Sequence, residues 1–149
     1  MLRDYDKYYG CAFSRLIDRI EVGIAVRRLP ERSQGFYLIE GTLPIVLKYS
    51  KSRRGPWTFS FGSEQLRDYC AVHEEYRLCV VAFVCGGDGI AALDDDQFSA
   101  VLDVHSKAQE AVSIRRRLKE MYSVGGSQGV LPEKISRDSL FESVQKLLG

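Results

Sequence analysis

The segment KYSKSRRGPWTFSF combines positive charge with aromatic rings. No acidic residue occurs between positions 41 and 63, and four basic side chains give that stretch a charge of +4. Cationic groups neutralise phosphates, and aromatic rings stack on bases or sugars. The segment is therefore a candidate nucleic-acid-binding surface. Its candidate contact residues are Lys48, Lys51, Arg53, Arg54 and Trp57.

A second basic cluster, SIRRRLK, contains Arg115, Arg116 and Arg117 and offers the same chemistry. Both clusters also have a structural interpretation. Aromatic residues at alternate positions of WTFSF are typical of a buried strand face, and a charged hairpin is often a solvated sheet edge that prevents aggregation. The sequence leaves a binding surface and a solvated edge as open alternatives.

Other chemically capable residues fit structural roles. Neither His73 nor His105 has the spacing of a metal site or of a nucleophile–base pair. The glycines of GGDG match no phosphate-binding loop and predict a hairpin turn. Asp88 and the DDD run at 94–96 could collect a divalent cation, because hard cations prefer carboxylate oxygens. A turn aspartate followed by a helix start explains the same four residues.

Hydrophobic periodicity predicts the elements of the first half of the chain. Residues 4–20 form an amphipathic helix with Phe13, Leu16, Ile17 and Ile20 on its apolar face. A half-buried strand is expected over 22–26. Three further β-rich runs and a second helix follow, with Ser63 as its N-cap. These runs are 36–41 and 43–50, which pair through a tight turn, and 57–61, and the helix covers 63–76.

The second half begins with RLCVVAFVC, an apolar run typical of a central strand buried on both faces. A hairpin then leads into IAAL, and a short helix starts at DDDQ. Alternation at Val112 and Ile114 predicts a strand, whereas RRRLKE fits either a strand or a helix. A C-terminal amphipathic helix is expected, capped by Asp138 or Ser139. The fold class is α+β, with a mixed sheet of five or more strands flanked by helices in a single domain, 1–149.

The order helix, three strands, helix, strand resembles the core of PD-(D/E)xK nucleases, also called the restriction-endonuclease-like core. The resemblance implies that Glu40 is the metal-binding acid, Lys48 the catalytic lysine and Glu21 an accessory carboxylate, with Mg²⁺ as the cofactor. Val46 stands two residues before Lys48, where that family carries a second metal-binding carboxylate. The acid-x-lysine motif is thus incomplete, which implies a weakened, relocated or lost metal-dependent nuclease activity.

Composition bounds the function classes. The net charge of the 149 residues is +1, so recognition of an anionic partner must come from local patches. No apolar run approaches a membrane span, and the charged N-terminus is unlike a signal peptide, so we expect a cytoplasmic protein with free thiols and no membrane partner. The leading hypothesis is a small nucleic-acid-associated protein with a degenerate nuclease-like domain. The alternative is a protein–protein interaction module, such as an inhibitor or assembly subunit without catalytic activity.

Overall fold

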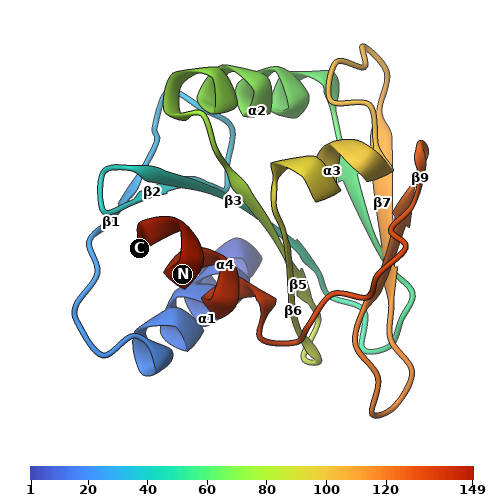
Figure 1. Ribbon diagram of the computed structural model, residues 1–149, viewed down its shortest axis with the longest axis horizontal. Helices are drawn as coiled ribbons and strands as arrows, with labels where there is room; N and C mark the ends of the chain where they lie inside the picture. The colour runs from blue at the N-terminus through green and yellow to red at the C-terminus, as the bar shows by residue number, and fades with distance from the viewer.

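A computed structural model describes all 149 residues as two β-sheets with four helices packed around them (Figure 1). The helices are α1 (Asp4–Arg19), α2 (Ser63–Tyr76), α3 (Asp95–Val101) and α4 (Ser139–Leu148). The first turns of α1 and α3 carry aspartates, and the last turn of α1 carries Arg19, which suits the helix dipole at both ends. Asp94 caps α3 by accepting a hydrogen bond from the Gln97 backbone N–H at 2.9 Å. The predicted α+β class is confirmed.

Sheet A has five strands in the order β1-β2-β3-β5-β6. They are β1 (Val26–Arg28), β2 (Phe36–Ile39), β3 (Leu43–Ser50), β5 (Val80–Cys85) and β6 (Gly89–Leu93). β2 and β3 form the expected antiparallel hairpin, and β5 and β6 form another across the GGDG turn. β5 lies parallel to β3, because α2 returns the chain over one face of the sheet before β5 begins.

Sheet B is antiparallel, with the order β4-β7-β8-β9. Its strands are β4 (Trp57–Phe61), β7 (Glu110–Arg115), β8 (Ser123–Gly126) and β9 (Gly129–Val130). β4 follows β3 in the chain but pairs with β7, more than 40 residues later. The chain therefore leaves sheet A at residue 50, contributes one strand to sheet B, and comes back through α2.

Every residue of β5 is buried, and its side chains alternate between two hydrophobic clusters. Val80, Ala82 and Val84 face α1 and α4, whereas Val81, Phe83 and Cys85 face α2, α3 and sheet B. Figure 1 shows the two pairs of helices on opposite sides of sheet A. The prediction of a central strand buried on both faces is confirmed.

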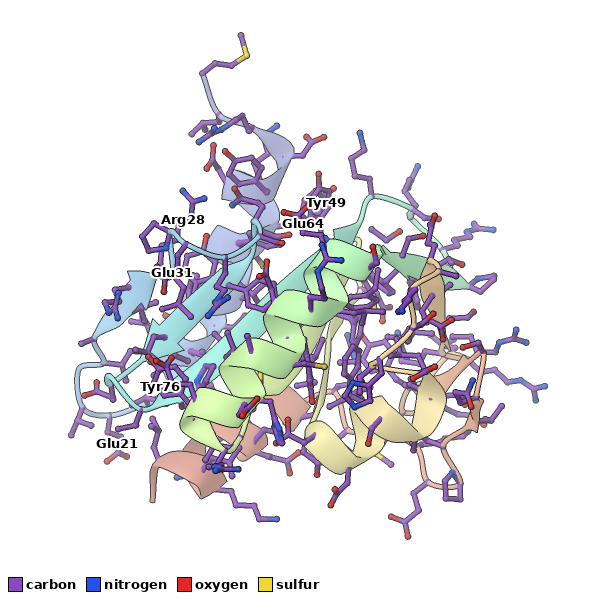
Figure 2. The ribbon with its side chains drawn as sticks, turned by 90° about the horizontal axis from the view of Figure 1, so that it is seen from above. Glu21, Arg28, Glu31, Tyr49, Glu64 and Tyr76 are labelled. Carbon is purple, nitrogen blue, oxygen red and sulfur yellow. The ribbon has the colours of Figure 1, made fainter.

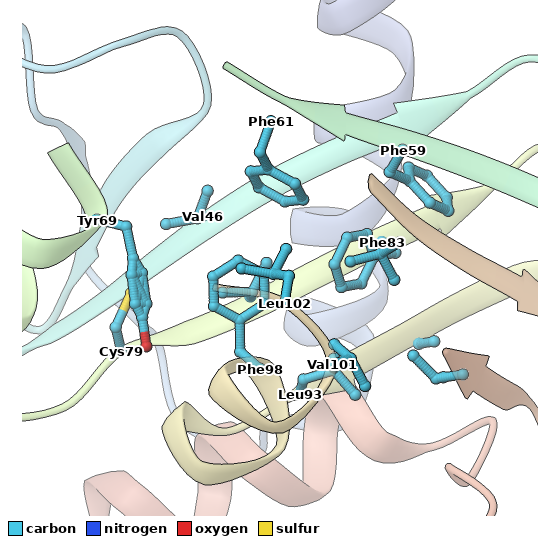
Figure 3. Close-up of a cluster of buried hydrophobic side chains, with 14 of the residues drawn as sticks. Val46, Phe59, Phe61, Tyr69, Cys79, Phe83, Leu93, Phe98, Val101 and Leu102 are labelled. Carbon is cyan, nitrogen blue, oxygen red and sulfur yellow. The ribbon is translucent and has the colours of Figure 1, made fainter. Parts of the chain in front are cut away.

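Aromatic rings fill the space between the two sheets. Phe59 and Phe61 of β4 point toward Phe83 of β5, with ring centroids 4.8 and 6.0 Å apart (Figure 3). Phe98 of α3 closes the group at 5.2 Å from Phe61. Trp57 is also buried, at 3% exposure, so the apolar face of WTFSF belongs to the core.

Four local predictions are corrected. The buried face of α1 runs through Tyr9, Ala12 and Leu16, which pack against sheet A, whereas Ile17 is 61% exposed. The first strand covers only Val26–Arg28 and its residues are exposed at the edge of sheet A. Gly62, one residue before Ser63, is the N-cap of α2. The RRRLKE segment is neither strand nor helix beyond residue 115 but the link between β7 and β8.

No helix of this structure has the length and apolar character needed to cross a membrane.

The close packing of β8 against the core gives a first prediction. A Cβ atom on Gly126 would collide with the carbonyl oxygen of Val101 and approach that of Ala111 to 2.9 Å, and both oxygens are backbone atoms. Gly126→Ala should therefore lower the free energy of unfolding by about 1 to 3 kcal/mol, as in other overpacked sites. Urea denaturation followed by circular dichroism measures this change.

The matched control is Gly10→Ala in α1, where an added Cβ meets no atom within 4 Å. That change should raise stability by about 0.5 to 1 kcal/mol, because alanine loses less conformational freedom than glycine in a helix. Equal effects of the two substitutions would contradict the packing described for β8.

Candidate functional site

Two basic links converge at one end of the molecule. The link between β3 and β4 carries Arg53 and Arg54, and Arg115 and Arg117 lie at the end of β7 and in the link to β8. Together they line a hollow of about 920 Å³ that we call the arginine hollow. The pairing of β4 with β7 places the two links side by side, because Trp57, the first residue of β4, is opposite Ile114. Arg53 and Arg54 of the first basic cluster therefore lie beside the arginines of the second.

Asp88 holds one side of this surface in place. It lies in the turn between β5 and β6 and accepts two hydrogen bonds from Arg116, at 2.6 and 2.9 Å. The Tyr122 hydroxyl donates a third at 2.8 Å, and Arg137 donates to the Asp88 backbone oxygen. The side chains of Arg116 and Asp88 are only 11% and 19% exposed, so solvent screens this pair less than a surface pair. The hydrogen bonds from Arg116 lower the pKa of the Asp88 carboxyl.

The β3–β4 link is fixed by its own contacts. The indole N–H of Trp57 donates to the Ser52 carbonyl at 2.9 Å, and the Ser52 hydroxyl donates to the Arg54 carbonyl at 2.8 Å. Gly86, with φ of 54°, packs so tightly that a Cβ there would collide with the Ser52 carbonyl oxygen. The backbone that carries Arg53 and Arg54 is thus anchored to the start of β4 and to the β5–β6 turn.

Four arginines of the hollow have no ion-pair partner. Arg53, Arg54, Arg115 and Arg117 are exposed, and none takes part in an ion pair. Arg116 is different, because Asp88 neutralises it. The hollow therefore presents a positive surface in a chain whose net charge is only +1.

Three other predicted contact residues are engaged elsewhere. The Lys51 ammonium pairs with Asp4 of α1 at 3.1 Å, and the hydrogen bond with that carboxylate raises the pKa of Lys51. Trp57 forms part of the floor of the hollow, but its ring is buried against Tyr122 and offers no face for a base. The expected stacking role of Trp57 is therefore corrected.

Lys48 points from β3 toward β4 and α2. Its ammonium donates to the Ser60 carbonyl at 2.6 Å and to Gln65 Oε1 at 3.4 Å, and it lies 4.7 Å from the centroid of the Phe61 ring. No carboxylate pairs with it, so burial lowers the pKa of Lys48 to about 8. Its contacts join β3 of sheet A to β4 of sheet B and to α2.

The residues named by the nuclease resemblance do not form one site. Glu21 and Glu40 line a second hollow, of about 510 Å³, between the end of α1 and α4. Glu40 Oε1 accepts a hydrogen bond from the Ala25 N–H at 2.7 Å, so this carboxylate fixes the approach to β1. Lys48 is the sixth residue of β3, and Glu40 precedes the first residue of that strand. At the rise of an extended strand, the backbones of Glu40 and Lys48 are therefore about 17 Å or more apart. In Figure 2, Glu21 is likewise far from Tyr49, the neighbour of Lys48.

No group of three or more histidine, cysteine, aspartate or glutamate side chains in this structure is arranged to hold a metal ion. The aspartates near residue 90 have separate roles: Asp88 binds Arg116 and Asp94 caps α3. Asp95 accepts from the Tyr69 hydroxyl at 2.8 Å and lies 3.3 Å from His73 Nε2. Burial raises the pKa of Asp95. The turn and helix-start interpretation of these residues is the one the geometry supports.

Sequence reasoning missed the role of Asp88, because its partner Arg116 is 28 residues away and in another hairpin. No local signal could have linked the two. The exposed Leu118, between Arg117 and Lys119, was also overlooked, although an apolar residue inside a basic run is visible in the sequence.

Comparison of the chain with protein-family models, curated proteins and solved structures finds no match. The resemblance to the nuclease core therefore stays a prediction.

The Asp88–Arg116 pair predicts a pH-dependent loss of stability. Asp88→Asn should lower the free energy of unfolding by about 1.5 to 3 kcal/mol at pH 7, because charge-assisted hydrogen bonds are lost. The pKa of Asp88 is lowered in the folded state, so its contribution is complete above the unfolded value of 3.8 and disappears as the pH falls through the folded value. The difference in the free energy of unfolding between wild type and variant should therefore be smaller at pH 3 than at pH 7. Urea denaturation at both pH values tests this, with the exposed Asp18→Asn as the control, and a gap independent of pH would contradict it.

Lys48 predicts a further rise of stability with pH, at the alkaline end. Its folded pKa is below its unfolded value of 10.5, so the unfolded chain binds more protons between about pH 8 and 10.5. Stability should rise across that interval by less than ~1.4 kcal/mol per pH unit relative to Lys48→Met, which has no charge to bury. Denaturation of both proteins from pH 7 to 10 measures the difference. Parallel pH profiles would show that the ammonium is not desolvated in the folded protein.

Proposed function

We propose that this protein binds the sugar-phosphate backbone of nucleic acid, and that the arginine hollow is the contact surface. The observation that carries the proposal is the convergence of four exposed arginines without ion-pair partners, from two links that are more than 50 residues apart in sequence. Guanidinium groups bind phosphates through two parallel hydrogen bonds and keep their charge at every physiological pH.

These four charges are unpaired although the chain contains enough acidic side chains to neutralise them. Its 21 basic and 20 acidic side chains nearly balance, and nearby acids are already paired, Asp88 with Arg116 and Glu120 with Lys134. If the hollow were only a solvated sheet edge, four cations in one concave surface would not stabilise the fold, because like charges repel. A polyanion relieves that repulsion and releases counterions when it binds.

The proposal covers binding and not cleavage. Glu40 is bonded to the backbone of residue 25 and Lys48 to β4 and α2, so the pieces of a metal-dependent nuclease site are separate. An acidic protein partner would use the same arginines, and this interaction-module alternative is an outcome of the test below.

The test is affinity as a function of salt. Fluorescence anisotropy with labelled DNA and RNA should show binding at low salt that weakens as salt rises. If all four arginines contact phosphates of a duplex, the slope of log K against log salt is about −3.6. The double variant Arg53→Ala/Arg54→Ala should reduce the slope by about 2.

The matched control is Arg27→Ala/Arg28→Ala, which removes two adjacent exposed arginines from β1 and the same net charge. It should leave affinity and slope close to those of the wild type. Absence of binding at low salt, or an equal loss in both double variants, would refute the proposal. If the protein binds no nucleic acid but binds an acidic protein in a way that requires Arg53 and Arg54, the interaction module is favoured.

A further inference from the structure

The arginine hollow has no free aromatic ring on its surface. Trp57 is 3% exposed and Tyr122 is fully buried, and their rings pack edge to face at 6.3 Å. The indole N–H is also occupied by the Ser52 carbonyl. Proteins that hold single strands without sequence preference depend on exposed aromatic rings that stack on unpaired bases. That source of affinity is missing from this surface.

The backbone that carries the arginines is fixed on both sides of the hollow. The β3–β4 link is anchored through Ser52 to Trp57 and Arg54. In the β7–β8 link, Arg116 bonds to Asp88 and also donates to the carbonyls of Arg117 and Glu120 at 3.2 and 3.3 Å. A surface fixed in this way suits a ligand whose phosphates are themselves held at constant spacing. A duplex has that property, whereas a flexible single strand must lose conformational freedom to match it.

The tip of the β7–β8 link adds an apolar contact. Leu118 is 83% exposed and lines the hollow beside Arg117. Lys119 follows it with φ of 68°, a left-handed conformation that side-chain-bearing residues seldom adopt. Proteins that bind a minor groove commonly combine arginines with an apolar side chain inserted at a base step. Arg117 and Leu118 supply both groups on one loop.

From these three observations we infer that the arginine hollow binds double-stranded nucleic acid in preference to a single strand, with Leu118 entering the groove. The inference builds on the proposed function and adds the form of the ligand. Arg53 and Arg54 contact phosphates from the opposite side of the hollow. No stacking of unpaired bases is involved.

The experiment compares a labelled duplex with each of its two separated strands at the same salt concentration. The wild-type protein should bind the duplex about tenfold or more tightly than either strand, since the strands gain no stacking energy. Leu118→Ala should weaken duplex binding by about five- to tenfold, because apolar contact area is lost. Its salt slope should stay at the wild-type value, because no phosphate contact changes. Leu118 is exposed, so thermal unfolding of the variant should match the wild type and confirm that it folds.

Val22→Ala is the matched control, since Val22 is 74% exposed and lies after α1, away from the arginine hollow. It should not affect either ligand. Equal or tighter binding of a single strand that still requires Arg53 and Arg54 would overturn the duplex preference and leave the proposed function intact. A duplex preference unchanged by Leu118→Ala would overturn the groove contact. Binding of neither form would overturn the proposed function itself.

Discussion

The burial of β5 on both faces is the constraint on which the rest of the structure depends. Its six residues are apolar and inaccessible to water, so each face needs its own cover. Helices α1 and α4 cover one face, and α2, α3 and sheet B cover the other. The Phe83 side chain packs against two aromatic rings of β4, those of Phe59 and Phe61. Sheet B is therefore required by the core, and its position brings the β7–β8 link to the end of the molecule where the β3–β4 link also turns.

The arginine hollow is a consequence of this arrangement. The β5–β6 turn carries Asp88, which binds Arg116, Tyr122 and Arg137 from three later parts of the chain. One carboxylate thus ties the main core strand to the surface loop that carries the basic cluster. Arg116 is the only arginine that pairs with this carboxylate, so Arg53, Arg54, Arg115 and Arg117 keep their charge exposed to solvent. Stability and charge presentation are coupled through the same side chain.

The two lysines of β3 and its link illustrate how tertiary contacts divide a basic run into different roles. Lys48 is drawn into the seam between the sheets and Lys51 is paired with α1, so each stabilises packing. Arg53 and Arg54, two and three residues further on, take part in no ion pair. Arginine and lysine are not equivalent here, because a lysine can lose its proton on burial whereas an arginine keeps its charge.

The sequence by itself determined the strand pattern of the core. Continuous apolar character predicted β5, alternation predicted the buried face of β4, and carboxylates predicted the start of α3, since these depend only on local periodicity and the helix dipole. Tertiary structure decided that β4 belongs to sheet B, that Ile17 faces solvent, and which arginines have no ion-pair partner. These outcomes depend on pairings between residues 28 or more positions apart, which leave no periodic signal in the chain.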